Sequence, residues 1–293
     1  MWRFRYRCEF DSHAKRGSNR LSTFQQKVDM IRIIFSIGLF IFVIFPCIVQ
    51  AQDRVAVDMG GDWLRRDWDD CEENVTGQHR DGVFAIHSDH AAALFWQVPT
   101  KNGAALSIDR GQDWIRRCDR PPRGFGKDVR KQAQGQYDLI SATEYPYISW
   151  RWQVSNTIDD SDTADHKGKI QKSGDDFAAK IGISVLNTKG KLREIAYLWT
   201  RTIPEETSLT QVTSILGFFK FKWYRIVAES GDRNVNQWVG ESRNFYRDFK
   251  RFYPDEVPAE VVRVYLMSDS DNTGSKVTGA FADLVFHRKP PEG

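Results

Sequence analysis

The residues of this chain best suited to bind a cation are acidic and lie near its C-terminus. Asp269, Asp271 and Asn272 fall within four positions, and Gly274 follows them. Oxygen ligands at alternate positions ahead of a glycine are typical of the first half of a calcium loop. An EF-hand would also need a bidentate Glu at its twelfth position, which here is Ala280. Two interpretations remain: an irregular calcium site, or a turn in which Asp and Asn bond their own backbone.

A second set of polar residues could bind a ligand or support the fold. Asp175 and Asp176 lie where a loop enters a predicted strand, and adjacent residues of a strand point to opposite faces, so only one of them can face a given site. Arg243 could clamp a carboxylate such as Asp269 or Asp176 with its guanidinium fork. The full set of candidate ligand-binding residues is Asp165, Asp175, Asp176, Glu241, Arg243 and Asn244.

Enzyme chemistry is less well supported than binding. A glycosidase would need two of these carboxyl groups at ~5–5.5 Å or ~6.5–9.5 Å, and the sequence fixes no such distance. The chain has no G-x-S-x-G, H-E-x-x-H or G-x-x-x-x-G-K-[ST] motif, which argues against several common hydrolase and nucleotide-binding classes. We therefore assign no catalytic residue.

Three tryptophans lie in polar stretches and could contact a sugar. Trp63, Trp68 and Trp114 each have Asp and Arg close by in the sequence. An exposed indole offers its face to the C–H groups of a sugar ring, while neighbouring polar side chains take the hydroxyls. The alternative is ordinary packing at the edges of a sheet.

Period-two alternation of apolar and polar residues dominates the chain and predicts an all-β fold. In 147–154 it places Ile148, Trp150, Trp152 and Val154 on one apolar face. Strands with little helical periodicity between them favour an antiparallel β-sandwich or jelly roll. The expected strands are 83–87, 91–98, 104–109, 147–154, 177–186, 194–200, 221–229, 237–242, 261–267 and 280–287.

One amphipathic helix is expected within 241–253. Phe245, Phe249 and Phe252 recur at helical spacing and form one apolar stripe, and Pro254 ends the pattern. We expect this stripe to pack over one end of a sheet.

The N-terminal segment, 1–51, is expected to be an extension followed by a signal peptide or membrane anchor. The stretch 33–49 is apolar and uncharged, Arg32 precedes it, and a small residue, Ala51, marks the expected cleavage point. Met30 would make a compact start, so either Met1 or Met30 can begin the natural chain. We expect 52–293 to be a single domain located in the periplasm or secreted, or held at the inner membrane facing the periplasm.

Removing this segment changes the charge and cysteine arguments. Residues 1–51 contain eight Lys and Arg and three acidic residues, so the remainder has a net charge of −2 and gives no basis for binding nucleic acid. Cys71 and Cys118 remain, an even pair that an oxidising compartment would allow to form a disulfide.

Several motifs in register resemble a bacterial exported family known as a domain of unknown function. The resemblance covers 145–290 well and 52–145 weakly, and it implies a secreted β-sandwich without an established reaction. The motifs are Trp150-Arg151-Trp152-x-Val154, Ala164-Asp165, Gly174-Asp175-Asp176-Phe177-Ala178-Ala179-Lys180-Ile181, Tyr197-x-Trp199, Glu241-x-Arg243-Asn244 and Met267-x-Asp269-x-Asp271-Asn272-Thr273-Gly274.

The sequence therefore predicts non-catalytic binding of a carbohydrate or another small polar ligand, with calcium as a candidate cofactor. The alternatives are a carboxylate-dependent polysaccharide hydrolase and a structural envelope protein.

Overall fold

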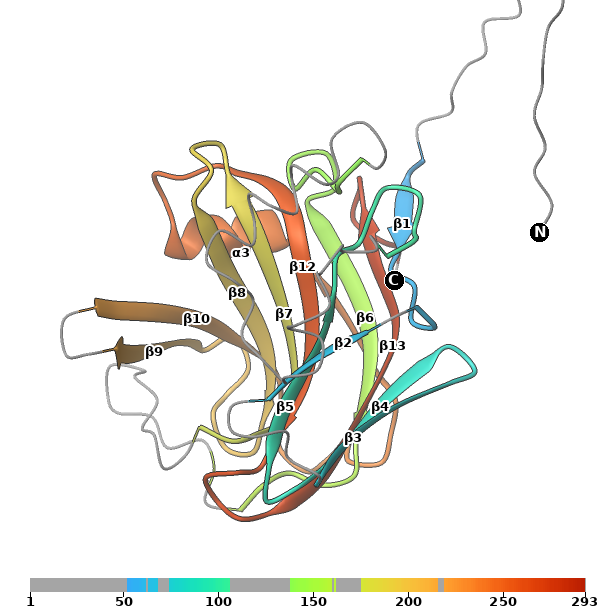
Figure 1. Ribbon diagram of the computed structural model, residues 1–293, viewed down its shortest axis with the longest axis vertical. Helices are drawn as coiled ribbons and strands as arrows, with labels where there is room; N and C mark the ends of the chain where they lie inside the picture. Colours follow the sequence, from blue (N-terminus) through green and yellow to red (C-terminus); the bar gives the residue numbers. More distant parts are fainter. Residues whose placement is uncertain are drawn as a thin grey trace, which may run out of the picture. The chain divides into compact units, whose positions relative to one another are not determined.

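A computed structural model describes residues 52–61, 63–67, 74–105, 138–159, 161, 175–215 and 219–292. Within these residues, two β-sheets pack face to face, with one helix beside them (Figure 1). The all-β sandwich with one amphipathic helix is therefore confirmed.

The first sheet has six strands within the described residues. Its pairings are antiparallel, and β1 adds to it by pairing with β13. Its strands, in spatial order, are β11 (Val239–Arg243), β6 (Tyr147–Val154), β13 (Lys276–His287), β4 (Val83–Asp89) and β3 (Val75–Arg80), with β1 (Arg54–Ala56) beside β13.

The second sheet has seven strands within the described residues and departs from purely antiparallel pairing at one place. Strand β10 runs parallel to β8. After β8 the chain forms β9 at the edge of the sheet, and it then turns back as β10, which is antiparallel to β9 and lies between β9 and β8. Its strands, in spatial order, are β2 (Leu64–Asp67), β5 (Ala92–Gln97), β12 (Pro258–Asp269), β7 (Phe177–Asn187), β8 (Leu192–Thr200), β10 (Phe219–Ser230) and β9 (Ser208–Ile215).

The alternating pattern located the central strands well. β6 has the predicted bounds, and its predicted apolar face is buried while Arg151 on the other face is exposed. Strands β1, β2, β3 and β9 were not predicted, because they are short or lack clear alternation, as in the sequence VTGQHR of β3. The expected strand at 104–109 lies mostly outside the described residues.

Aromatic side chains form the core between the two sheets. The ring of Trp150 on β6 lies 5.0 Å from that of Tyr197 on β8, and Trp152 lies 5.7 Å from Trp199, measured between ring centroids. All four residues are buried. Burial of such large side chains makes them a main source of the attraction between the sheets.

The helix α3 (Phe245–Phe252) begins later than the sequence suggested. Glu241 and Arg243 pair with β6 as part of β11, so they lie outside the helix. Asn244 caps the first turn, because its side-chain oxygen accepts a hydrogen bond from the Arg247 amide at 2.9 Å. Phe245 and Phe249 are buried in the core, which confirms the apolar stripe.

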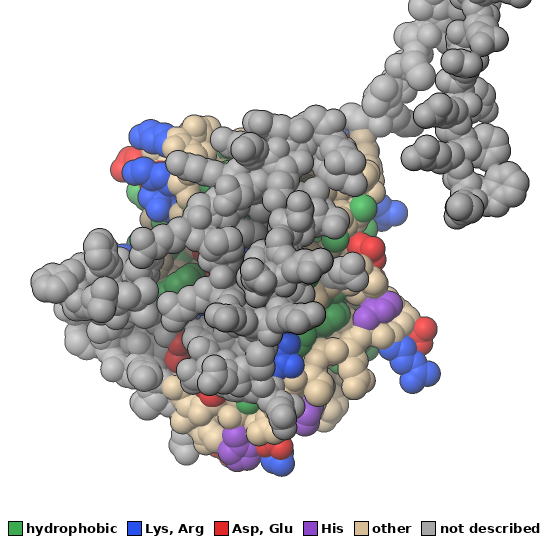
Figure 2. Space-filling model, in the orientation of Figure 1, with side chains coloured by type: hydrophobic (Ala, Val, Ile, Leu, Met, Phe, Trp, Pro, Cys, Tyr) green, Lys and Arg blue, Asp and Glu red, His purple; other side chains and the backbone are tan. Residues whose placement is uncertain are grey.

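The surface of the described residues carries charges of both signs. Where Figure 2 shows described residues, small groups of Lys and Arg lie close to Asp and Glu. None of the described helices has the length and apolar character needed to cross a membrane.

Gly182 on β7 should be intolerant of any side chain. Tyr265 on β12 lies across it, and a Cβ at position 182 would come within 1.9 Å of the Tyr265 ring. We expect Gly182→Ala to lower the free energy of unfolding by about 2–4 kcal/mol, because the ring must be displaced. Gly240→Ala is the control, since its new Cβ would lie 3.9 Å from Cγ of Arg151, which is an ordinary van der Waals contact. Equal losses in urea unfolding of the two variants would contradict this account.

Candidate functional site

Two acidic segments that are far apart in sequence meet at one end of the seven-stranded sheet. β12 ends at Asp269, and its antiparallel neighbour β7 begins at Phe177, the residue paired with Asp269. Asp175 and Asp176 immediately precede β7, and Asp271 and Asn272 follow β12. The sequence predicted both segments, but it did not predict that they meet.

Asp176 holds the loop between β12 and β13 in place. Its carboxylate is fully buried and accepts four hydrogen bonds. The Asn272 amide and side chain donate to Oδ1, both at 3.1 Å, and the Thr273 amide and hydroxyl donate to Oδ2 at 2.7 and 2.6 Å. Gly274 has a φ of +65°, which completes the turn without strain.

The buried carboxylate of Asp269 has fewer polar partners than that of Asp176. The residue is 5% exposed, and its Oδ2 lies 3.7 Å from Nζ of Lys180. Its Oδ1 is buried and has no hydrogen-bond partner among the described residues. Burial raises the pKa of the Asp269 carboxyl well above its usual value; Lys180 opposes this rise, and the nearby Asp175, Asp271 and Asp176 add to it.

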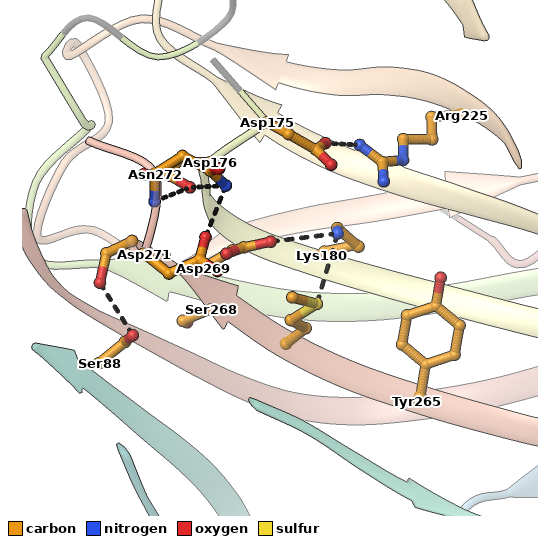
Figure 3. Close-up of polar contacts among 12 residues, drawn as sticks. Ser88, Asp175, Asp176, Lys180, Arg225, Tyr265, Ser268, Asp269, Asp271 and Asn272 are labelled. Carbon is orange, nitrogen blue, oxygen red and sulfur yellow. Dashed lines mark hydrogen bonds and ion pairs between the residues drawn. The ribbon is translucent and has the colours of Figure 1, made fainter. Parts of the chain in front are cut away.

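Asp176, Asp269 and Asp271 form a carboxylate triad. One oxygen atom from each lies within 4.8 Å of the others, and Asp271 is exposed while the other two are buried. Asn272 places its side-chain nitrogen between two of these groups, donating to Asp176 at 3.1 Å and to Asp271 at 2.6 Å. Figure 3 shows these groups converging at the end of β12. The triad could hold a metal ion, since such oxygen clusters suit hard cations.

The adjacent acids Asp175 and Asp176 face different partners, as alternation along a strand requires. Asp176 faces the loop, whereas Asp175 forms an ion pair with Arg225 on β10 (Figure 3). Lys180 lies between these groups on β7, with Nζ 3.3 Å from Sδ of Met267 and 5.3 Å from the centre of the Phe177 ring. Burial, together with the nearby Arg225, lowers the pKa of the Lys180 ammonium.

The same face of the sheet carries a polar group that the sequence did not suggest. Glu194 on β8 accepts hydrogen bonds from Arg263 at 2.6 Å, from Tyr265 at 2.9 Å and from Ser184 at 3.0 Å. A signal was present, because polar residues occur at alternate positions of otherwise apolar strands, as at Lys180 and Ser184 in β7. This face points away from the core between the sheets, where Ile181 and Ile183 are buried.

Glu241, Arg243 and Asn244 have structural partners in the fold. Arg243 forms ion pairs with Asp248 at 3.1 Å and with Glu206, so it does not clamp Asp269 or Asp176. Asn244 is the helix cap. Glu241 lies on β11 opposite Trp150, and burial followed by the charge of Glu229 raises the pKa of its carboxyl to about 8.

Some predicted residues lie outside the described part of the chain. They are Asp165, Ala51, Cys71, Cys118, Trp68 and Trp114. Trp63 is described and packs at the sheet edge: its ring lies 5.2 Å from that of Phe84, and its indole N–H donates to the Met59 carbonyl at 3.3 Å. For this tryptophan, packing is the interpretation that fits.

These features define a β-sandwich protein with a carboxylate triad at one end of its larger sheet. The chain belongs to the family described as "Protein of unknown function (DUF3047)", which matches residues 133–285. This match confirms the resemblance, noted in the sequence, to a family known as a domain of unknown function. A comparison with curated proteins found no match.

Solved structures with some similarity include two xyloglucanases and a xylanase. The xyloglucanase domain of NopAA from Sinorhizobium fredii, solved with cellobiose, is 7% identical, with a TM-score of 0.35, over 80% of this chain and 97% of that chain. A major endo-1,4-β-xylanase of Trichoderma reesei is 8% identical, with a TM-score of 0.32, over 78% and 99%. The family 12 xyloglucanase of Bacillus licheniformis is 9% identical, with a TM-score of 0.30, over 76% and 98%. Scores of this size do not place the chain in any of these enzyme families.

Glu241 should make stability depend on pH. Its carboxyl loses a proton near pH 4.5 in the unfolded chain but near pH 8 in the folded protein. Between these values the folded state holds a proton that the unfolded state releases, so the free energy of unfolding falls as pH rises. Glu241→Gln should remove this slope and stabilise the protein at pH 8 by about 1–3 kcal/mol, with little change at pH 4.5.

Urea unfolding at a series of pH values measures this effect. The matched control is Glu292→Gln, which changes an exposed Glu near the C-terminus. If Glu241→Gln and Glu292→Gln gave the same pH profile as the unchanged protein, a raised pKa at Glu241 would be ruled out.

Proposed function

We propose that this protein binds a carbohydrate or another small polar ligand without catalysis, and that a calcium ion at Asp176, Asp269 and Asp271 assists the binding. The observation that carries the proposal is the Oδ1 atom of Asp269. It is buried without a hydrogen-bond partner among the described residues, beside two further carboxylates. An unpaired buried carboxylate oxygen is costly, and a cation would compensate it.

Calcium fits this group of ligands better than a transition metal. The donors are carboxylate oxygens, with no His or Cys among them. A half-turn of the Asn272 side-chain amide would exchange its nitrogen for its oxygen, and so place a fourth oxygen between Asp176 and Asp271. Outside the cytoplasm, where we expect this protein, calcium sites of modest affinity in the range of about 10⁻⁴–10⁻³ M are useful.

The cation would also give a polar ligand a place to bind. Calcium takes about 6–8 oxygen ligands, whereas one oxygen from each carboxylate and one from the amide would fill only part of that number. Asp271 is exposed, so the unfilled positions would lie on the solvent side of the site. Adjacent hydroxyl groups of a sugar are well suited to replace water at such positions. This arrangement supports a polyhydroxylated ligand.

Binding is favoured over hydrolysis because three carboxylates beside Asp269 and Asp271 already have firm partners. Asp176 accepts four hydrogen bonds from the loop, Asp175 pairs with Arg225, and Glu194 is bonded to Arg263 and Tyr265. A glycosidase needs one carboxyl as proton donor and a second as nucleophile or base. Carboxylates whose oxygens are already engaged in hydrogen bonds and ion pairs are poorly suited to donate or accept the protons of a reaction.

Calcium should raise the melting temperature of the purified protein. With calcium at about ten times its Kd, we expect an increase of about 2–4 °C over the same protein in EDTA. Asp271→Asn should abolish most of the increase, because it removes the exposed carboxylate while leaving Asp176 and Asp269 in place. The control is Asp81→Asn, which changes an exposed acid at the tip of the β3–β4 turn. A shift equally large in Asp271→Asn would show that calcium binds elsewhere.

Ligand binding should include a component that requires calcium. Titration calorimetry with neutral and acidic oligosaccharides, in calcium and then in EDTA, measures it. We expect at least one oligosaccharide to bind the unchanged protein in calcium, with affinity about tenfold weaker or worse in EDTA and in Asp271→Asn. Release of new reducing ends during the incubation would overturn the non-catalytic assignment. If no oligosaccharide bound more tightly in calcium than in EDTA, the role of the cation would be overturned.

A further inference from the structure

We propose a second binding site, for the flat face of a sugar ring, on the outer face of the six-stranded sheet. It consists of the indole of Trp238, the guanidinium of Arg151 and the carboxylate of Asp283, here called the Trp238 platform. These residues come from the loop before β11, from β6 and from β13. The Trp238 platform shares no residue with the carboxylate triad, so it does not depend on a cation.

Trp238 is exposed although it is a large aromatic residue. It is 39% exposed, whereas the core tryptophans of β6 and β8 are almost completely buried. Its neighbour Val239 packs against the core. Since adjacent residues of an extended chain point to opposite sides, Trp238 lies on the outer side of the sheet. Because much of this indole remains in contact with water, it contributes little to the stability of the fold.

Other contacts hold Trp238 in one orientation. The guanidinium carbon of Arg151 lies 5.3 Å from the centre of the indole ring, which is a cation–π contact. The preceding loop is bonded to β6, because the Asn236 amide donates to the Val154 carbonyl at 2.9 Å and the Gln153 side chain donates to the Asn236 carbonyl at 2.6 Å. A surface whose side chains are fixed before binding loses less entropy when a ligand arrives.

Asp283 is directed to this place by an irregularity in β13. The pairing of β13 with β6 shifts register between Ala282 and Val285, and Asp283 there has a φ of +50°. A side chain in this left-handed region costs conformational energy that a glycine would avoid. Its Oδ2 accepts a hydrogen bond from Nε of Arg151 at 2.5 Å. Both side chains remain half exposed or more, so their other polar atoms can reach a ligand.

The space beside Arg151 is open. Gly240 is paired directly opposite Arg151, and a Cβ there would find Cγ of Arg151 at 3.9 Å. With no side chain at Gly240, the sheet surface beside the indole and the ion pair is left uncovered, and a flat ligand could lie there against the indole face that Arg151 does not contact. A glycine within a strand is often found where another group approaches closely.

The chemistry of these three groups selects a neutral pyranose with equatorial hydroxyls. Such a ring has axial C–H groups on each face, and these pack against an indole. The Asp283 carboxylate accepts hydrogen bonds from ring hydroxyls, and the Arg151 guanidinium donates to their oxygens. Because Arg151 and Asp283 neutralise each other, an acidic sugar gains no advantage. The fitting ligands are β-linked chains of glucose- or xylose-type rings.

Titration calorimetry of the purified protein in EDTA, with cellohexaose and xylohexaose as probes, tests the Trp238 platform apart from the calcium site. We expect at least one probe to bind. Trp238→Ala should weaken it about tenfold or more, and Trp238→Phe should keep part of the affinity because an aromatic face remains. Asp283→Gly should weaken binding while leaving the melting temperature equal or higher, because glycine relieves the left-handed φ. Leu192→Ala, which truncates another exposed apolar side chain, should bind normally.

Binding of neither probe in EDTA, or equal binding by Trp238→Ala and the unchanged protein, would overturn the Trp238 platform. Those results would leave the calcium-dependent melting shift untouched. Conversely, loss of that shift with binding in EDTA intact would overturn the role of calcium and retain the Trp238 platform.

Discussion

The antiparallel pairing of β7 with β12 is the constraint on which the carboxylate triad depends. It places Phe177 opposite Asp269, and this brings Asp176 from one segment beside Asp271 from another that follows about ninety residues later. A slip of one residue in this pairing would turn every side chain of the strand to the other face, and would move Ile181 among the outer ion pairs and Lys180 into the apolar core between the sheets. The apolar alternation that builds the core therefore also fixes the geometry of the triad.

The same register explains why charged residues are buried on this sheet. Lys180, Arg225 and Arg263 lie on the face opposite the core, each with a carboxylate partner. Taking such groups out of water is costly, and pairs of this kind often contribute little net stability. What they provide is orientation, because each pair fixes the position of two long side chains. Asp269 links the two features, because it pairs with Lys180 and is also a member of the carboxylate triad.

Sequence reasoning identified the fold and the local elements better than their contacts. Alternation in 147–154 predicted both faces of β6, since each face has a distinct environment. The acids near Asp175 and Asp269 were singled out by residue type and turn chemistry. Their meeting depends on strand order, which no local pattern encodes. Arg243 was considered as a clamp for Asp269 or Asp176, but it pairs with Asp248, which lies only five residues away on the adjoining helix. Trp238 was passed over because exposure of an indole depends on its neighbours in space.

The aromatic bridge between the sheets has a spectroscopic consequence. Trp150 and Trp152 lie edge to face with ring centroids 5.4 Å apart, and Trp152 also contacts Trp199 from the opposing sheet. Indole transitions so close together couple and give rise to paired bands of opposite sign in ultraviolet circular dichroism. Separation of the layers would uncouple Trp152 from Trp199 even if every strand kept its hydrogen bonds, whereas Trp150 and Trp152 would stay together on β6. The circular dichroism of these tryptophans therefore reports whether the two sheets remain packed against each other.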